Sequence, residues 1–382
     1  MGLKIGLVLS GGGARGAYQV GVLKGVSEIL RKHQIQPDIR IYTGVSAGAI
    51  NASFLASQSQ DFHEGVSQLV KLWSNLTTDD VFNSDAVHMG KIAMTWATEL
   101  GFGALVGTTP GRALLDTGPL RQLLKKNLDT DGIARNLEAG HFDALAITAV
   151  SYAASNSVTF LQSRDDLAHW DKARRRSVKT AINVDHVMAS SAIPLLFPPA
   201  QVDGGWFGDG CVRNLEPCSA ALKLGADRLL VIGVRKRGGT IQEAYSIVQA
   251  AEAPSVARVV NLILNAVLLD GVERDIEYIE RVNEFIRLTP EGNRGQFKYR
   301  AIEHAIVSPS ADIGQIAAGK TSRLPRLVRY LIKGLGGLDD AAEIVSYLLF
   351  SPDFCQQLIE IGCQDAWAAE ESIRRLFQEA DA

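Results

Sequence analysis

The 382-residue chain is poor in cysteine, in charge of one sign and in long apolar runs. Its four cysteines are too few for a disulfide framework at this length, and none is spaced with a histidine as metal ligands are. They therefore predict reduced thiols in a cytoplasmic compartment and give no indication of a metal site. These cysteines are Cys211, Cys218, Cys355 and Cys363.

Charge and hydropathy exclude further classes of protein. A net charge of −3 provides no positive field for nucleic acid, so we expect no nucleic-acid partner. No uninterrupted apolar run approaches the length of about 18 residues that indicates a transmembrane helix. The N-terminus, "MGLKIGLVLSGGG", lacks a charged region ahead of an apolar core and does not resemble a signal peptide. The sequence predicts a cytoplasmic protein that contacts membranes at most peripherally.

What the chain does contain is 46% apolar residues in an ordered series of strand and helix patterns. Short β-branched runs at 4–10 and 39–43 predict buried parallel strands, each followed by a glycine-rich turn and an apolar helix. This repeated order predicts an α/β fold on a parallel sheet. Further strands are predicted at 142–163 and 228–234. Beyond about residue 240 the pattern predicts helices without further strands.

The second glycine-rich turn, "TGVSAGA", places Ser46 between Gly44 and Gly48, where a strand gives way to a helix. This is the arrangement of a nucleophile elbow, in which a strained turn projects the serine hydroxyl beside a helix N-terminus that favours negative charge. The motif alone is weak evidence, because the chain holds 36 glycines and serine also caps helices. Its position between a strand and a helix makes Ser46 the candidate nucleophile.

The first glycine-rich turn, "GGGARG" at 11–16, has two interpretations. It matches the GxGxxG pattern of dinucleotide-binding sites, but the acidic residue expected at the end of the next strand is absent. The turn can instead form an oxyanion hole, because successive glycines leave backbone N–H groups unobstructed beside Ser46. Arg15 is expected to hold the turn, to pair with a phosphate or carboxylate, or to lie exposed. The residues of the predicted oxyanion loop are Gly11, Gly12, Gly13, Ala14, Arg15 and Gly16.

No histidine is well placed to serve as the general base for Ser46. A histidine base after a nucleophile elbow should come late in the chain and in a loop, and the late His304 falls in a predicted helix. His186 precedes a helix-to-loop boundary, which is more typical of a surface residue. A carboxylate is therefore the expected base.

The chain resembles the patatin-like phospholipases from residue 4 to about 235. The segments that carry the resemblance are, in order, "LSGGGARGAY", "TGVSAGAIN", "ASSAIPLLFPP" and "DGCVRNLEP" with "ALKLGAD" after it. The resemblance implies a three-layer α/β fold with a mostly parallel central sheet. It implies a patatin-like catalytic domain over 1–240 and a helical C-terminal extension over 241–382 packed on it.

The same resemblance implies a serine esterase of the phospholipase A or lysophospholipase type. Such an enzyme cleaves acyl esters of phospholipids or other lipids through a Ser–Asp dyad and needs no cofactor. Ser46 would be the nucleophile, and the amides around Gly12 and Gly13 would bind the oxyanion. The family's Asp-Gly motif supplies the base, and the chain offers Asp203 and Asp209. The Asn, Pro and "ALKLGAD" that follow fit the register of Asp209, whereas they lie six residues too far from Asp203.

Other features of the sequence remain open. Cys211 replaces the small residue that usually follows the family's Asp-Gly. The apolar stretch 94–111 can cap an acyl channel or pack in the core, and the basic amphipathic segment 321–335 can lie on a membrane or on the core. "RRR" at 174–176 is interpreted as a solvated helix end. The rival functions are a nucleotide-binding oxidoreductase domain and a catalytically silent lipid-binding scaffold; the sequence indicates no oligomeric state.

Overall fold

The protein is seen here in a computed structural model that describes residues 3–83, 113–164, 167, 169–172, 174–214, 216–237, 259, 271–294, 297, 299–326, 328–330 and 342–378. In these ranges a ten-stranded sheet runs in the order β10-β9-β1-β2-β3-β4-β6-β5, and β8 pairs with both β3 and β7. The strands are β1 (Ile5–Leu9), β2 (Ile39–Val45), β3 (Ala144–Ser151), β4 (Asn156–Ser163), β5 (Asp171–Lys172), β6 (Arg175–Lys179), β7 (Ala200–Val202), β8 (Gly205–Asp209), β9 (Arg228–Ile232) and β10 (Glu303–Val307).

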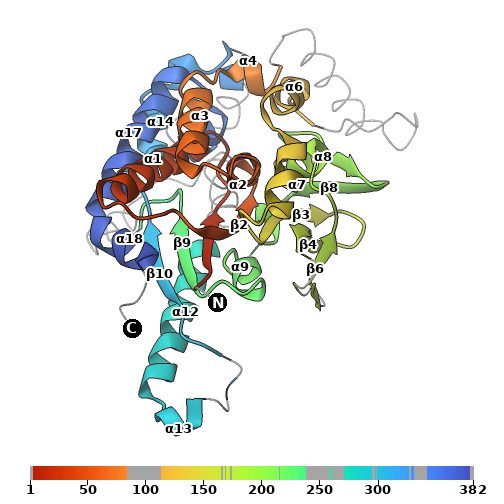
Figure 1. Ribbon diagram of the computed structural model, residues 1–382. Coiled ribbons are helices and arrows are strands. Elements are labelled where there is room, and N and C mark those ends of the chain that lie inside the picture. Colours follow the sequence, from red (N-terminus) through yellow and green to blue (C-terminus); the bar gives the residue numbers. More distant parts are fainter. Residues whose placement is uncertain are drawn as a thin grey trace.

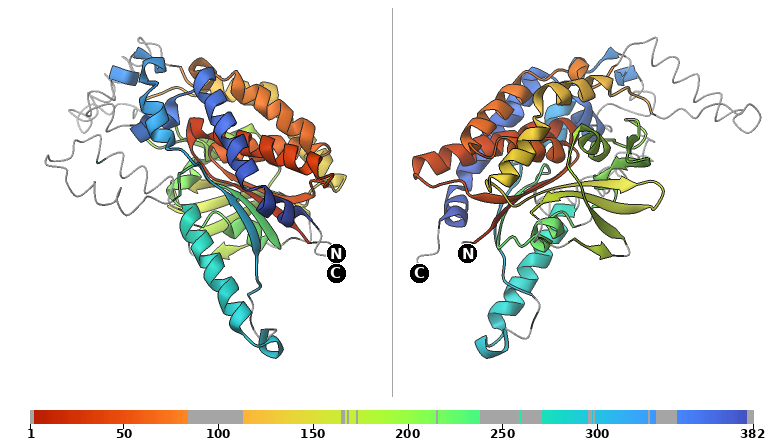
Figure 2. Two further views of the ribbon diagram at one scale, coloured as in Figure 1. Left: turned by 90° about the vertical axis from the view of Figure 1, so that its left-hand side faces the viewer. Right: turned by 45° about the vertical axis from the view of Figure 1, so that its right-hand side comes forward.

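Helices cover both faces of this sheet (Figure 1), and the hairpin of α12 and α13 projects away from the body of the molecule (Figure 2). The helices are α1 (Gly16–Lys32), α2 (Ala47–Ser57), α3 (Phe62–Ser74), α4 (Thr78–Val81), α6 (Gly118–Asn127), α7 (Thr130–Glu138), α8 (Val184–Ser190), α9 (Ser219–Lys223), α12 (Gly271–Leu288), α13 (Glu291–Arg294), α14 (Ile313–Ala318), α16 (Ala342–Leu348), α17 (Pro352–Ala368) and α18 (Glu370–Phe377). Short 3₁₀ turns span Gly13–Arg15, Gly210–Val212 and Thr321–Arg323.

The two faces of β1 enter different hydrophobic cores. Leu7 and Leu9 belong to the larger core with α1, α2 and α17, whereas Val8 belongs to a second core with α9 and α12. Successive side chains of a strand point to opposite faces, so an apolar run buried on both sides requires helices above and below it. The three layers confirm the predicted fold class, an α/β fold with a mostly parallel central sheet and a largely helical C-terminal region.

The direction of the strands positions the candidate site. The five strands β10, β9, β1, β2 and β3 run parallel, so their carboxyl ends meet at one edge of the sheet. The antiparallel β8 returns along β3 and brings its last residue, Asp209, opposite Ala149. The turns that follow β1 and β2 and the end of β8 therefore converge, as ligand sites at the ends of parallel strands do.

Two expectations about secondary structure are wrong. β10 lies beyond residue 240 and extends the parallel sheet beside β9, and residues 175 and 176 of the "RRR" stretch begin β6 rather than end a helix. Both strands are short and carry charged residues, because strands near a sheet edge need bury only part of their surface. The boundary predicted at 240/241 falls outside the described residues, so the division into two domains stays a prediction.

The stretches considered for lipid contact are described only in part. Residues 94–111 lie outside the described ranges, and of 321–335 the structure describes 321–326 and 328–330. Leu324 and Val328 from the latter are buried in the larger core. Among the described residues, none of the helices combines the length and the apolar character needed to span a bilayer.

Candidate active site

Ser46 lies in the turn between β2 and α2 with a strained backbone. Its φ of +56° is a left-handed value that non-glycine residues seldom adopt. A side chain on Gly44 would lie 2.2 Å from the carbonyl oxygen of Gly48, and one on Gly48 would lie 2.3 Å from that of Leu9. Both positions therefore require glycine, and the turn that they permit is the predicted nucleophile elbow.

The "ASSAIP" segment holds this turn from the other side. The Ser46 N–H donates to Ser190 Oγ at 3.0 Å, and the Ser190 hydroxyl donates to the carbonyl oxygen of Thr148 at 2.6 Å. The Ser191 hydroxyl donates to the carbonyl oxygen of Ser46 at 3.2 Å. Because the N–H and the carbonyl oxygen of Ser46 are both hydrogen-bonded, the surrounding structure fixes the strained backbone conformation. The side-chain hydroxyl takes no part in these bonds.

Asp209 ends β8 and is 1% exposed. Its N–H donates to the carbonyl oxygen of Ala192 at 2.8 Å, and its Oδ1 accepts the Cys211 N–H at 2.9 Å. Within the described part of the chain, the buried Oδ2 accepts no well-aligned hydrogen bond. Burial raises the pKa of Asp209 to about 6, opposed by the nearby Ser46 side chain and by the Cys211 N–H and thiol.

The other candidate bases lie elsewhere. Asp203 is exposed in the turn of the β7–β8 hairpin, where φ is +47° at Asp203 and +80° at Gly204. His186 is buried rather than on the surface, with Nδ1 engaged by Asn183 in a helix cap, and burial lowers its pKa. His304 lies in β10, not in a helix, with Nε2 3.6 Å from a carboxylate oxygen of Glu280.

The glycine-rich loop faces the Ser46 turn with two unused backbone donors. The Arg15 N–H donates to the carbonyl oxygen of Gly12 at 3.1 Å, and the Gly16 N–H donates into the same 3₁₀ turn. Among the described residues, the N–H groups of Gly12 and Gly13 have no backbone acceptor. Gly13 lines the cavity that contains Ser46, and a side chain on Gly11 would lie 3.0 Å from Ser46 Cβ, so these glycines border the site.

Arg15 is fully occupied inside the protein and is not exposed. Its guanidinium pairs with Glu343, its Nε donates to Ser346 Oγ at 2.8 Å, and an Nη donates to the carbonyl oxygen of Val234 at 3.3 Å. It also lies 5.1 Å from the ring centroid of Tyr347. The α16 helix therefore clamps the glycine-rich loop. The sequence analysis missed these α16 residues, because no local pattern links them to the loop.

An apolar cavity opens beside Ser46, between α2, α3 and α6. It is narrow, with a volume of about 40 Å³, and its polar contributions include Ser46, Ser191 and Asn127. A wall of this kind accepts hydrocarbon and offers charged groups no partner. The apolar residues that line it include Ala47, Ile50, Trp73, Leu124, Phe197 and Phe350. Among the described residues, no group of three or more His, Cys, Asp or Glu side chains could hold a metal ion.

The model of the patatin-like phospholipase family matches residues 7–222, more than half of the chain. The chain belongs to the patatin-like phospholipase family. This match covers the Ser46 turn, the glycine-rich loop and Asp209, which the sequence resemblance had singled out. The family assignment therefore agrees with the resemblance, and it rests on the family model alone.

Solved structures that resemble this patatin-like chain are distant. VipD from Legionella pneumophila is 14% identical over 94% of this chain and 67% of its own, with a TM-score of 0.32. Human GIVD cytosolic phospholipase A2 in complex with methyl gamma-linolenyl fluorophosphonate is 12% identical over 98% of this chain, with a TM-score of 0.38. This chain spans 59% of the length of that phospholipase chain. A chain in the complex of SpcU with ExoU from Pseudomonas aeruginosa is 14% identical over 91% of this chain and 70% of its own, with a TM-score of 0.28.

Proposed function

We propose that this protein is a lipid acyl hydrolase in which Ser46 attacks the ester carbonyl and Asp209 takes the serine proton. The observation that carries the proposal is the strained Ser46 turn lying against a buried carboxylate with a raised pKa. Family membership supports the substrate class, a fatty-acyl ester of a phospholipid or another lipid. The exposed position of Asp203 supports Asp209 as the base of the dyad.

The proposed reaction proceeds in two acyl transfers. Ser46 Oγ bonds to the carbonyl carbon while its proton passes to Asp209, and collapse of the intermediate breaks the bond to the alcohol oxygen, which takes that proton. Water then attacks the acyl-serine ester and gives a proton to Asp209. The bond to Ser46 Oγ breaks, the proton returns to the serine, and the fatty acid leaves.

The raised pKa of Asp209 suits this role. At about 6 the carboxylate is still ionised at neutral pH, and it is a stronger base than an aspartate at its ordinary value of 3.8. An acyl chain bound over the site would exclude water and raise the pKa further. A buried aspartate can therefore act on serine directly, without an imidazole between them.

Two features of the site would stabilise the transition state of this reaction. The N–H groups of Gly12 and Gly13, which have no backbone acceptor among the described residues, would donate to the carbonyl oxygen as it becomes negative, and one such donor is worth about 2.7–4 kcal/mol. The apolar cavity beside Ser46 would take the start of the acyl chain. We therefore assign the glycine-rich loop at 11–16 to the oxyanion, with Arg15 as a positioning residue that holds the loop.

The test is mass mapping of a fluorophosphonate adduct together with release of fatty acid from phosphatidylcholine. We expect the label on Ser46 in the wild-type protein, and both labelling and turnover lost in Asp209→Asn. The matched control is Asp203→Asn, which should retain both. An unlabelled Ser46 in the folded wild-type protein would overturn the proposed hydrolase, and loss in Asp203→Asn alone would reassign the base.

A further inference from the structure

A second cavity, of about 650 Å³, lies on the face of the sheet covered by α9 and α12. Its walls come from β6, from α9, from α12 and from the segment that leads into β10. Ser46, Asp209 and the glycine-rich loop are not among its described lining residues. Its volume falls in the range of about 300–1,000 Å³ that is typical of small-molecule sites.

The cavity has an excess of positive charge. Four cationic side chains line it, Arg175, Lys223, Arg274 and Arg300, against two acidic ones. Arg175 pairs with Glu216. Arg300 donates to the carbonyl oxygen of Ala226 at 2.7 Å and lies 3.5 Å from a carboxylate oxygen of Asp227. These pairs leave Lys223 and Arg274, for which the described part of the chain provides no ion pair or hydrogen bond.

The surroundings of Lys223 disfavour its positive charge, and a bound anion would offset this effect. Its Nζ lies 4.9 Å from the ring centroid of Trp170. Burial lowers the pKa of Lys223, the positive charges of Arg175 and Lys172 lower it further, and the negative charge of Glu216 opposes them only in part. A bound anion would relieve this repulsion and favour the charged ammonium.

The buried acidic residue of the cavity, Asp275, has no ion pair with Lys223 or Arg274 among the described residues. Asp275 on α12 is buried, and its Oδ2 accepts the Cys218 N–H at 2.7 Å. Burial raises its pKa to about 6, so it is more easily neutralised than an aspartate at its ordinary value of 3.8. The remaining carboxylate, Glu216, is engaged by Arg175. Neither carboxylate is therefore bonded to Lys223 or Arg274.

The mouth of the cavity is aromatic. Tyr278 and Tyr299 line it and remain 55% and 60% exposed, and Leu222 and Ile279 add apolar surface. Exposed tyrosine rings offer flat faces for stacking against a planar group. Two cations that have no ion pair among the described residues, Lys223 and Arg274, match the two negative charges of a phosphate monoester, which also accepts several hydrogen bonds. The positive charge and the exposed rings together indicate a ligand in which a phosphate is joined to a planar or apolar group.

We propose that this cavity binds a small soluble phosphate monoester with a planar body, of the nucleotide type. Its phosphate pairs with Lys223 and Arg274, and its body lies against Tyr278 and Tyr299. The proposal stands on residues outside the Ser46 site and does not depend on hydrolase activity. Binding is therefore measured directly, on the full chain and without a lipid substrate.

The experiment is calorimetric titration with adenosine 5′-monophosphate, repeated by tryptophan fluorescence because Trp170 adjoins Lys223. We expect saturable binding that weakens about tenfold or more in Lys223→Gln and in Arg274→Gln. The matched control is Arg281→Gln, since Arg281 lies on the same helix, is 77% exposed and pairs with Glu277 outside the cavity. Thermal melts of each variant establish that a loss of binding is not a loss of fold.

Two further titrations identify the source of the phosphate. Inorganic phosphate should bind more weakly than adenosine 5′-monophosphate, because it lacks the body that meets the tyrosines. Vesicles of phosphatidylcholine with phosphatidic acid should not compete. Absence of nucleotide binding, equal weakening in Arg281→Gln, or binding to the vesicles alone would each overturn the proposal.

Discussion

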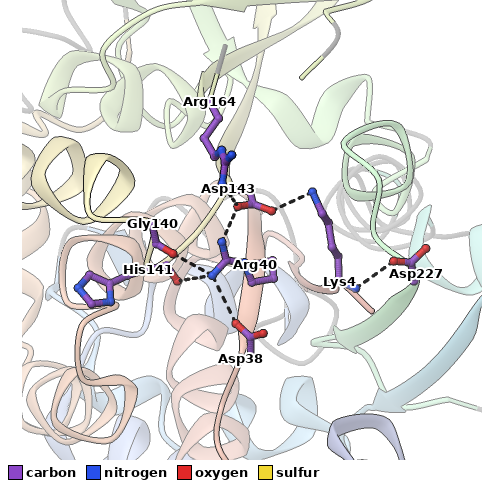
Figure 3. Close-up of polar contacts among 8 residues, drawn as sticks. All are labelled: Lys4, Asp38, Arg40, Gly140, His141, Asp143, Arg164 and Asp227. Atoms are coloured by element: carbon purple, nitrogen blue, oxygen red, sulfur yellow. Dashed lines mark hydrogen bonds and ion pairs between the residues drawn. The ribbon is translucent and has the colours of Figure 1, made fainter. Parts of the chain in front are cut away.

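Each end of the central sheet holds a buried aspartate, but the two carboxylates have different partners. At the amino end, Asp143 contacts three cationic side chains, Lys4, Arg40 and Arg164 (Figure 3). Its carboxylate oxygens lie 2.9 Å from Lys4 Nζ, 2.5 Å from Arg40 Nη2 and 3.6 Å from Arg164 Nη1. At the carboxyl end, Asp209 has one backbone donor and an Oδ2 that, within the described residues, has no hydrogen-bond partner. Both side chains are almost inaccessible, 4% exposed for Asp143 and 1% for the Asp209 residue.

The pKa values of the two carboxyl groups differ accordingly. Burial alone would raise the pKa of Asp143, but hydrogen bonds from Arg40 and Lys4 outweigh it and hold the pKa below its ordinary value. At Asp209 the effect of burial exceeds that of the hydrogen bonds, so the pKa is raised. The comparison shows that burial does not by itself set the chemistry of an aspartate, because the donors around it decide. The ion pairs of Asp143 are of the kind that stabilises a fold, whereas the raised pKa of Asp209 suits the base proposed for the other end.

The largest expected effect is on catalysis at the carboxyl end. Asp209→Asn should lower kcat/KM for lipid ester hydrolysis by about a thousandfold or more, because a positioned general base contributes about 10²–10⁴. It should not lower the free energy of unfolding at pH 7, since it removes a charge that burial disfavours. Steady-state kinetics and urea unfolding of the same preparation measure both. A large loss of stability with activity preserved would reverse the roles of the two ends.

The next effect is on stability at the amino end. Asp143→Asn should lower the free energy of unfolding by about 2 kcal/mol, because Arg40 and Lys4 would lose their shared carboxylate. The activity per folded molecule should stay unchanged. Asp171→Asn is the control, since Asp171 and Arg176 form an exposed pair that is worth about 0–1 kcal/mol. Equal losses in the two variants would contradict the comparison.

The smallest expected effect is a difference between the pH dependence of hydrolysis and that of stability. Hydrolysis should fall about tenfold per pH unit below about 6, because only ionised Asp209 accepts the serine proton. The stability that Asp143 provides is present above its ordinary value of 3.8 and is lost only as the pH falls through its lower folded pKa. Activity should therefore be lost while the fold persists. Coincident loss of activity and of circular dichroism signal would show that the two ends are not separate.

Local signals in the sequence predict much of this site. The Ser46 turn follows from two glycines around a serine between a strand and a helix, and the resemblance to the patatin-like family, through the register of its later motifs, implies Asp209 rather than Asp203. These features are fixed by neighbouring residues, so a short window of sequence contains them. The roles assigned to Ser46 and Asp209 stay predictions until the labelling experiment is done.

Contacts between distant segments could not be predicted in the same way. Nothing near Arg15 indicates that its partner is Glu343, and nothing in "EHAIV" at 303–307 distinguishes an edge strand from part of the predicted helix. β6 was missed for the same reason, because its residues alternate weakly and are mostly charged. Such elements take their structure from the sheet that they join, and tertiary context outweighs local preference.

The clamp on the glycine-rich loop has a consequence for how the protein is made. The loop at 11–16 is translated before α16, since Glu343 follows Arg15 by 328 positions. At about 5–20 residues per second, the interval between them is on the order of tens of seconds. During translation Arg15 has neither Glu343 nor Ser346 to contact. The loop is therefore made before the helix that secures it.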